Sequence, residues 1–209
     1  MWSVSHSGSS QAREDRRGTR PHQALEWGEM ATTTIRNATP ADVPVILDFI
    51  RALAIYEREP DAVSATEEGL KRDGFGPNPF YFCLIAEHDG TPAGFALYFF
   101  NYSTWMGRPG LYLEDLFVHP EFRGLGIGKA LLQQVAAVAV EKNCPRLQWE
   151  VLDWNTPAID FYRAMGAEFL DEWRNVRVTG EALARLAGLS AGGKDGVAAN
   201  GCGSLETES

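Results

Sequence analysis

Hydrophobic residues recur along the chain with two different periods, one typical of helices and one typical of strands. Apolar residues three and four positions apart predict helices from Thr39 to about Tyr56 and from Ile127 to about Asn143. The first begins with a Thr N-cap followed by Pro, with an acidic residue three positions after the cap. Shorter helices are predicted over Thr66–Arg72 and from Thr156 to a C-terminal glycine, Gly166.

Strand-like segments lie before, between and after these helices. They cover residues 33–37, 80–86, 93–101, 111–118, 147–152 and 172–178. The second and third should form a hairpin through His88-Asp89-Gly90. The resulting order, β-α-α-β-β-β-α-β-α-β, predicts one α/β domain with a mixed sheet over residues 33–187.

Both ends of the chain differ in composition from this segment. Residues 1–32 are polar and rich in Ser, Arg and Gly, and residues 188–209 are rich in Gly, Ser and Ala. Neither shows hydrophobic periodicity, so both are predicted to be disordered. Residues 1–32 also lack the apolar stretch of a secretory signal, and Met30 offers an alternative start just before the first strand.

Composition narrows the classes of partner. A net charge of −9 argues against general nucleic-acid binding and favours a small cationic ligand. No apolar run approaches the roughly 20 residues of a membrane span. The three cysteines, Cys83, Cys144 and Cys202, are too scattered to predict disulfides or a metal site. We therefore expect a cytoplasmic protein that acts without a metal and without a membrane.

Three glycines at alternate positions follow the strand 111–118 and lead into the next helix. Gly124, Gly126 and Gly128 carry no Cβ, so neighbouring main-chain N–H groups can converge on one anion near the positive end of the helix dipole. A tight turn without a ligand is the alternative. A Rossmann site would need Gly-x-Gly-x-x-Gly, and a P-loop would need Ser or Thr where Ala130 stands.

The remaining interpretation is a site for the pyrophosphate of acyl-CoA. Residues Arg123 to Gly128 resemble the Arg/Gln-x-x-Gly-x-Gly/Ala motif of the GCN5-related N-acetyltransferase superfamily. The resemblance extends over about residues 33–187. It implies the fold of that superfamily: a mixed, mostly antiparallel central sheet flanked by helices.

Further segments are similar to the diamine acetyltransferases, the spermidine/spermine N1-acetyltransferase family. They cover residues 73–81, 102–105, 112–118, 151–155 and 161–167. Ser-Thr-Trp at residues 103–105 and Val-Leu-Asp-Trp-Asn at 151–155 are most similar to the thialysine N-epsilon-acetyltransferase branch. The resemblance implies acetyl-CoA as co-substrate, a small cationic amine as acceptor, and a homodimer.

Acetyl transfer to an amine needs a base for the ammonium proton, donors for the oxyanion and an acid for the departing thiolate. The resemblance assigns the base to Glu114, directly or through water, and the acid to Tyr162. Because adjacent strand residues face opposite sides, only one of Glu114 and Asp115 should face the amine. Glu114 and Asp115 could instead be two charges on an edge strand without a catalytic role. Tyr162 could instead be a core aromatic residue beside Phe161.

The resemblance also assigns the cofactor contacts. The main chain at Leu116, Phe117 and Val118 serves the thioester oxyanion and the pantetheine arm. The pyrophosphate is assigned to Arg123, Gly124, Leu125, Gly126, Ile127 and Gly128, and a second contact to Asn155, Thr156, Pro157 and Ala158. For Asn155, a helix cap is the alternative.

The implied substrate residues are Tyr56, Glu57, Ser103, Trp105, Glu114 and Glu150. Glu57 suits a distal ammonium, although a solvated helix end is the alternative. The residues around Glu150 depart from the family pattern, which leaves its side-chain role open. Polyamine-specific members carry Asp where this chain has Ser103, so thialysine or a small diamine is favoured over spermidine and spermine.

Two other functions remain open at this point: a non-catalytic acyl-CoA-binding module and a protein-lysine acetyltransferase. The presence of both Glu114 and Tyr162 favours an enzyme. The acidic character of the amine side favours a small cation over a polypeptide.

Overall fold

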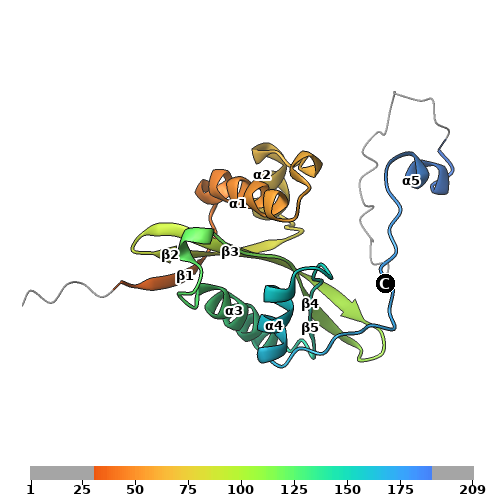
Figure 1. Ribbon diagram of the computed structural model, residues 1–209. Coiled ribbons are helices and arrows are strands. Elements are labelled where there is room, and N and C mark those ends of the chain that lie inside the picture. The colour runs from red at the N-terminus through yellow and green to blue at the C-terminus, as the bar shows by residue number, and fades with distance from the viewer. Residues whose placement is uncertain (1–30, 190–209) are drawn as a thin grey trace, which may run out of the picture. The chain divides into compact units, whose positions relative to one another are not determined.

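A computed structural model describes residues 31–189 as two compact units, one ending at Glu150 and the other beginning at Val151 (Figure 1). The first contains β1 (Thr33–Asn37), α1 (Val43–Tyr56), α2 (Glu67–Phe75), β2 (Phe82–His88), β3 (Thr91–Ser103), β4 (Arg108–Val118), α3 (Ile127–Glu141) and β5 (Leu147–Gln148), with single 3₁₀ turns at Pro40–Asp42, Pro60–Ala62 and Pro120–Phe122. The second contains α4 (Thr156–Ala164) and α5 (Gly180–Leu186).

The five strands of the first unit form one sheet in the order β1-β2-β3-β4-β5. All neighbours are antiparallel except β4 and β5, which are parallel. Asp89 and Gly90 both adopt positive φ (49° and 75°) in the two-residue turn between β2 and β3, as a type I′ hairpin turn requires. The predicted hairpin and the mixed, mostly antiparallel sheet are confirmed.

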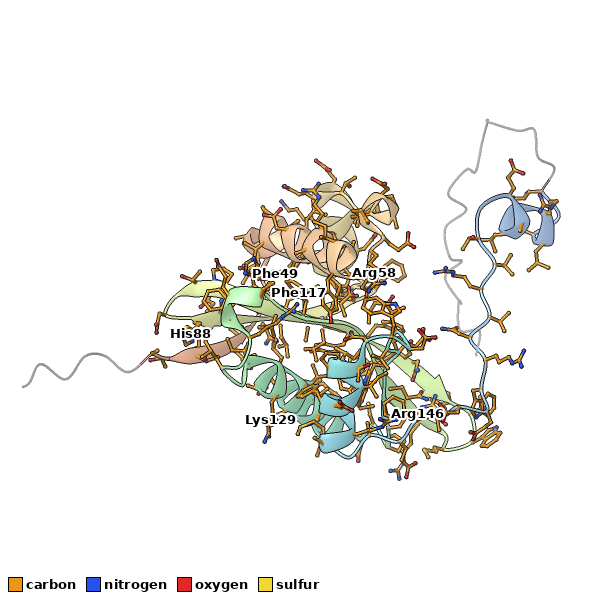
Figure 2. All side chains as sticks on the ribbon, in the orientation of Figure 1. Phe49, Arg58, His88, Phe117, Lys129 and Arg146 are labelled. Carbon is orange, nitrogen blue, oxygen red and sulfur yellow. The ribbon has the colours of Figure 1, made fainter. Side chains whose placement is uncertain are left out.

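Helices cover both faces of this sheet, with α1 on one side and α3 on the other (Figure 1). On the α1 side, Phe49 stacks on Phe95 of β3, with ring centroids 5.5 Å apart, and lies 5.9 Å from Phe117 of β4 (Figure 2). On α3, Leu131 and Val135 are fully buried. Each such side chain contributes about 1.5–3 kcal/mol by leaving water, so the two layers hold the sheet between them.

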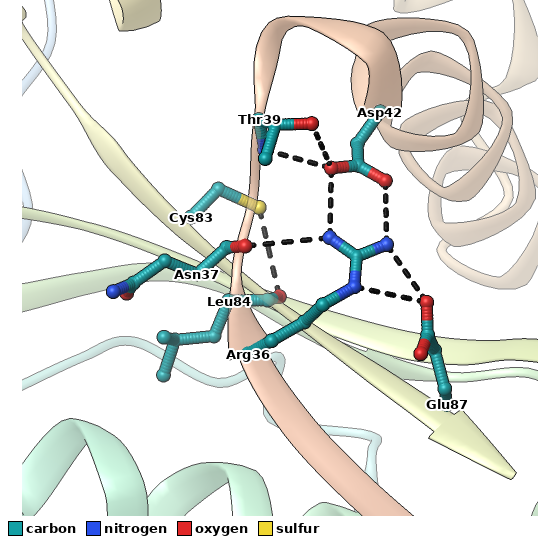
Figure 3. Close-up of polar contacts among 7 residues, drawn as sticks. All are labelled: Arg36, Asn37, Thr39, Asp42, Cys83, Leu84 and Glu87. Atoms are coloured by element: carbon teal, nitrogen blue, oxygen red, sulfur yellow. Dashed lines mark hydrogen bonds and ion pairs between the residues drawn. The ribbon is translucent and has the colours of Figure 1, made fainter. Parts of the chain in front are cut away.

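A network around Arg36 joins β1, β2 and the turn that leads into α1 (Figure 3). The Arg36 guanidinium donates to both carboxylate oxygens of Asp42, at 2.8 and 2.7 Å, and to Glu87 at 2.9 and 2.7 Å. Asp42 also accepts the main-chain N–H of Thr39 at 2.7 Å, as the predicted helix start requires. The hydrogen bonds from Arg36 hold the pKa of Asp42 well below its usual range.

Three elements differ from the prediction. β5 covers two residues, because β4 and β5 pair only at Leu111↔Leu147 and Tyr112↔Gln148. Residues 172–178 form no strand, because no strand in residues 31–189 pairs with them and Val176 stays 85% exposed. α5 is not among the helices predicted from the sequence, although Glu-Ala-Leu-Ala-Arg-Leu consists of strong helix formers.

The predicted disorder of residues 1–30 and 190–209 lies outside the described residues. From residue 31 to residue 189, no helix is long and apolar enough to cross a membrane.

Replacing Arg36 by Ala should lower the free energy of unfolding by about 1–2 kcal/mol at pH 7, because two carboxylates lose charge-assisted hydrogen bonds. The partial exposure of Arg36 keeps the loss below that of a fully buried pair. Urea denaturation measures the difference. Arg51→Ala, which removes an exposed contact to Asp48, is the control and should cost less.

The loss of unfolding free energy caused by Arg36→Ala should be smaller at acidic pH. Asp42 has a lowered pKa in the folded state, so its stabilisation is present above the unfolded pKa of about 3.9 and is lost as the pH falls further. An equal cost for Arg36→Ala at pH 7 and at about pH 2 would contradict this role.

Candidate active site

A β-bulge interrupts the pairing of β4 at Glu114. Leu97 of β3 pairs with Asp115, and the next residue, Tyr98, pairs with Leu113. Glu114 is therefore the extra residue on β4. A bulge of this kind breaks the strict alternation of side chains along a strand.

The bulge brings Glu114 and Asp115 to the same face of the sheet. Asp115 pairs with Leu97, a member of the hydrophobic cluster beneath α1. Phe99 lies two residues beyond Leu97 on β3 and therefore also faces α1, as does its partner Tyr112. Glu114 lies two residues after Tyr112 on β4, so it faces α1 as well. The expectation that only one of the two acids faces this side is therefore wrong, because it assumed an unbroken strand.

Four carboxylates gather on this side: Glu57 after the end of α1, Glu114 and Asp115 on β4, and Glu150 after β5. We call these four residues the acidic cluster. The charges of Glu114 and Glu57 both act on Asp115, and the side chain of Tyr112 is hydrogen-bonded to Glu150. The sequence predicts Glu57, Glu114 and Glu150 for the amine side. The structure brings these three together with Asp115.

Burial is the main influence on the pKa of two of these residues, Asp115 and Glu57. Burial, reinforced by the charges of Glu114 and Glu57, raises the pKa of Asp115 to about 7. Burial also raises the pKa of Glu57. Burial, the hydrogen bond to Glu150 and nearby negative charge raise the pKa of the Tyr112 hydroxyl. A partly buried carboxylate beside other carboxylates is unfavourable in its ionised form. Such a group therefore favours binding of a cationic ligand or of a proton.

Beside the acidic cluster, one edge of β4 is open. Pairing with β5 ends at Tyr112, so in the described part of the chain the rest of this edge has no strand partner. The N–H of His119 donates to β3 at 2.9 Å. Alternation of main-chain groups then points the N–H of Phe117 toward β3 and those of Leu116 and Val118 toward the open edge. Two main-chain donors are thus available to a ligand lying along β4.

The glycine loop lies between β4 and α3. Gly124 and Gly126 adopt left-handed backbone, with φ of 82° and 78°, and Gly126 is the N-cap of α3. The first helical hydrogen bond runs from Ala130 N–H to the Gly126 carbonyl at 3.0 Å, so the N–H groups of residues 127–129 have no acceptor within the helix. This arrangement suits a phosphate.

Arg123, the first residue of the predicted motif, is held against the α1 side of the sheet. Its Nε donates to the carbonyl of Val118 at 3.1 Å. Its guanidinium carbon lies 4.9 Å from the ring centre of Tyr56 and 6.0 Å from that of Phe117. Lys129 is exposed on the outer side of α3 (Figure 2).

The remaining predicted residues of the first unit, Ser103 and Trp105, lie at the end of β3 and in its connection to β4. Ser103 is 4% exposed, and its hydroxyl accepts the N–H of Met106 at 3.3 Å. Trp105 is 91% exposed. Ser103 pairs with Arg108, six residues along β4 from Glu114, a separation of about 20 Å. One copy of the described chain therefore does not bring Ser103 to the acidic cluster.

The second unit holds the predicted acid and the second cofactor segment. Tyr162, on α4, is buried and packs beside Phe161 with ring centroids 5.3 Å apart. Thr156, Pro157 and Ala158 form the first turn of α4. The side-chain oxygen of Asn155 accepts the N–H of Ala158 at 3.4 Å, so Asn155 caps α4, and its contact with acetyl-CoA stays a prediction.

Two residues of the site, Tyr112 and Asp115, are not among the functional residues predicted from the sequence. The adjacent acids Glu114-Asp115 were the available signal for Asp115, but nothing in the sequence marks the bulge. Within residues 31–189, no three His, Cys, Asp or Glu residues are grouped to hold a metal ion.

Comparisons with known proteins show the family to which the chain belongs. Residues 47–167 match the Acetyltransferase (GNAT) family. The chain is 48% identical over 170 residues to thialysine N-epsilon-acetyltransferase of Bos taurus, covering 76% of this chain and 99% of the relative. It is 34% identical over 201 residues to L-ornithine N5-acetyltransferase of Arabidopsis thaliana, covering 75% and 88%. The structure of aminoglycoside N-acetyltransferase AAC(6′)-Iy in complex with CoA matches with a TM-score of 0.57 and 21% identity, covering 72% and 95%.

The chain therefore belongs to the Acetyltransferase (GNAT) family, whose members use acetyl-CoA, and it is an N-acetyltransferase. Within that family it falls among the diamine acetyltransferases, in the thialysine N-epsilon-acetyltransferase branch. The family, the branch and the fold expected from the sequence are confirmed.

Replacing Gly126 by Ala should lower the free energy of unfolding by about 1–2 kcal/mol, because an L-residue at φ 78° is strained. Gly128→Ala is the matched control. Gly128 lies in α3, and a Cβ there would lie 3.6 Å from Val118 Cγ2, an ordinary contact. Ala in a helix should be neutral or stabilise by up to about 1 kcal/mol. Equal losses in urea denaturation would show that left-handed backbone is not the constraint.

Proposed function

We propose that this protein transfers the acetyl group of acetyl-CoA to a primary amine of a small cationic acceptor, such as a thialysine-like amino acid or a short diamine. The observation that carries the proposal is the acidic cluster beside the open edge of β4. A thioester held by the main chain of Leu116 and Val118 lies next to carboxylates that bind an ammonium. The names of the two relatives, which act on thialysine and ornithine, support an acceptor of this class.

The cofactor is proposed to bind along β4 and the start of α3. Its pyrophosphate lies on the loop Arg123–Gly128, where the free N–H groups and the helix dipole favour negative charge. Its pantetheine arm follows the open edge of β4. Residues Asn155–Ala158 supply the second contact expected from the family resemblance.

The reaction is proposed to proceed by direct attack. Glu114 takes a proton from the ammonium, directly or through water, and the neutral amine nitrogen bonds to the thioester carbonyl carbon. The N–H groups of Leu116 and Val118 stabilise the oxyanion that forms. The carbon–sulfur bond then breaks, and the Tyr162 hydroxyl gives its proton to the CoA thiolate. The nitrogen loses its second proton as the amide forms, and that proton restores the Tyr162 hydroxyl.

The acceptor is proposed to be shorter than a polyamine. The position of Ser103 carries no acid, and its hydroxyl is buried and engaged with Met106. Ser103 and Trp105 lie far from the acidic cluster of their own chain. A homodimer, expected from the family resemblance, would let the exposed Trp105 reach the amine site of the second copy. Light scattering at several protein concentrations tests the dimer.

A thiol-release assay with acetyl-CoA tests the function. The panel contains thialysine, ornithine, putrescine, spermidine, lysine and a histone peptide. We expect the highest kcat/KM with one of the short cationic amines. Preference for the histone peptide would indicate a protein-lysine acetyltransferase. Acetyl-CoA binding without release from any amine would indicate a non-catalytic acyl-CoA-binding module, and either result would overturn the proposal.

Glu114→Gln should lower kcat by about 10²–10⁴-fold, because the amide cannot take the ammonium proton. Acetyl-CoA affinity, measured by calorimetry, should stay within a few-fold of wild type. Glu141→Gln, a matched change in the last turn of α3, should leave both quantities unchanged. Wild-type turnover in Glu114→Gln across the pH range would exclude Glu114 as the base.

Tyr162→Phe should lower kcat by about 10²-fold, the low end of general-acid contributions, because a thiolate is a good leaving group. The variant keeps the buried ring and removes only the hydroxyl. Tyr102→Phe, at an exposed position, is the control. A normal rate in Tyr162→Phe would show that another group protonates CoA.

A further inference from the structure

Asp115 has a place in the site that the proposed mechanism does not use. Its carboxyl group is partly buried on the α1 side of β4, next to Glu114, because the bulge turns it there. A carboxyl group in such a position is costly when it is charged, unless a cation accompanies it. No core packing requires an acid opposite Leu97, so the residue invites a functional explanation.

We propose that Asp115 is a second proton-binding group of the amine site, which holds a proton in the free enzyme and releases it to solvent when a cationic amine binds. This inference rests on the proposed function and concerns the same site. The proton leaves the carboxyl oxygen of Asp115 as the ammonium arrives, so the site exchanges one positive charge for another. Glu114 remains available as the base for the attacking nitrogen.

The groups that face Asp115 from each neighbouring element support this role. Glu114 lies beside it on β4, and Glu57 approaches from the end of α1. On β2, Cys83 is buried, and its thiol has a pKa raised to about 12, mainly by burial and partly by the charges of Asp42 and Asp115. The Arg123 guanidinium, on the same side of the sheet, is engaged with Val118 and the Tyr56 ring.

The sign of the effect follows from these surroundings. Burial and the two negative neighbours raise the pKa of Asp115 to about 7, so the carboxyl group is largely protonated at pH 6 and largely ionised at pH 8.5. A bound ammonium stabilises the ionised form and lowers this pKa. Amine binding should therefore release close to one proton near pH 6 and almost none near pH 8.5. Amine affinity should rise with pH over the same interval.

Calorimetry measures this release without any turnover. Thialysine is titrated into the protein saturated with CoA, which carries no acetyl group, in phosphate and in imidazole at pH 6.5. The difference in apparent enthalpy, divided by the difference in buffer ionisation enthalpy, gives the protons released. We expect at least half a proton for the wild type and less than about 0.2 for Asp115→Asn.

Two further variants complete the test. Asp48→Asn, the same change on the exposed side of α1, should release protons as the wild type does. Glu114→Gln removes one of the charges that act on Asp115, so the midpoint of proton release should move to lower pH. If Asp115→Asn fails to fold or to bind the amine, this shift decides the question.

Wild-type proton release in Asp115→Asn, or an unmoved midpoint in Glu114→Gln, would overturn the inference while leaving the proposed function intact. Failure of the proposed function itself looks different. In that case the wild type either releases no thiol with any amine of the panel or prefers the histone peptide.

Discussion

The site depends on one constraint, the register of β4 against β3. With regular alternation after Leu113, Asp115 and Phe117 would both face α3. The bulge at Glu114 instead turns Phe117 toward α1, where it lies 5.9 Å from Phe49. Leu113 remains buried on the other face. Leu113 and Phe117 can pack on opposite faces of the sheet only with the extra residue in place. Core packing therefore fixes the register that brings Glu114 and Asp115 to the same face.

The rest of the fold supports this arrangement from both ends of α1. The Arg36 network anchors the start of the helix through Asp42, and Glu57 follows its last residue about 21 Å away. Because α1 is a rigid helix, the position of its first turn, fixed by Arg36 and Asp42, also determines where Glu57 lies in the acidic cluster. On the other side of β4, the early end of pairing with β5 frees the edge that we assign to the cofactor. In this proposal β4 contacts both the amine that accepts the acetyl group and the acetyl-CoA that donates it.

Much of this fold follows from sequence pattern, because hydrophobic period and turn chemistry act locally. The Asp89-Gly90 turn, the N-cap at Thr39 and the left-handed glycines before α3 are where their residue types require them. The bulge at Glu114 has no such signal, since its cause is packing between Phe117 and a helix more than 60 residues earlier in the chain. Likewise, a strand at 172–178 could not be judged from alternation alone, because a strand needs a partner.

The central claim is that Glu114 and Asp115 face the amine together. A crystal structure of the protein with CoA and thialysine tests it most directly. We predict carboxyl oxygens of both residues on the α1 side of β4, with Glu114 within about 3.2 Å of the reacting nitrogen or of a water that bridges to it. Regular alternation through residue 114, with the Asp115 side chain turned toward α3, would contradict the account.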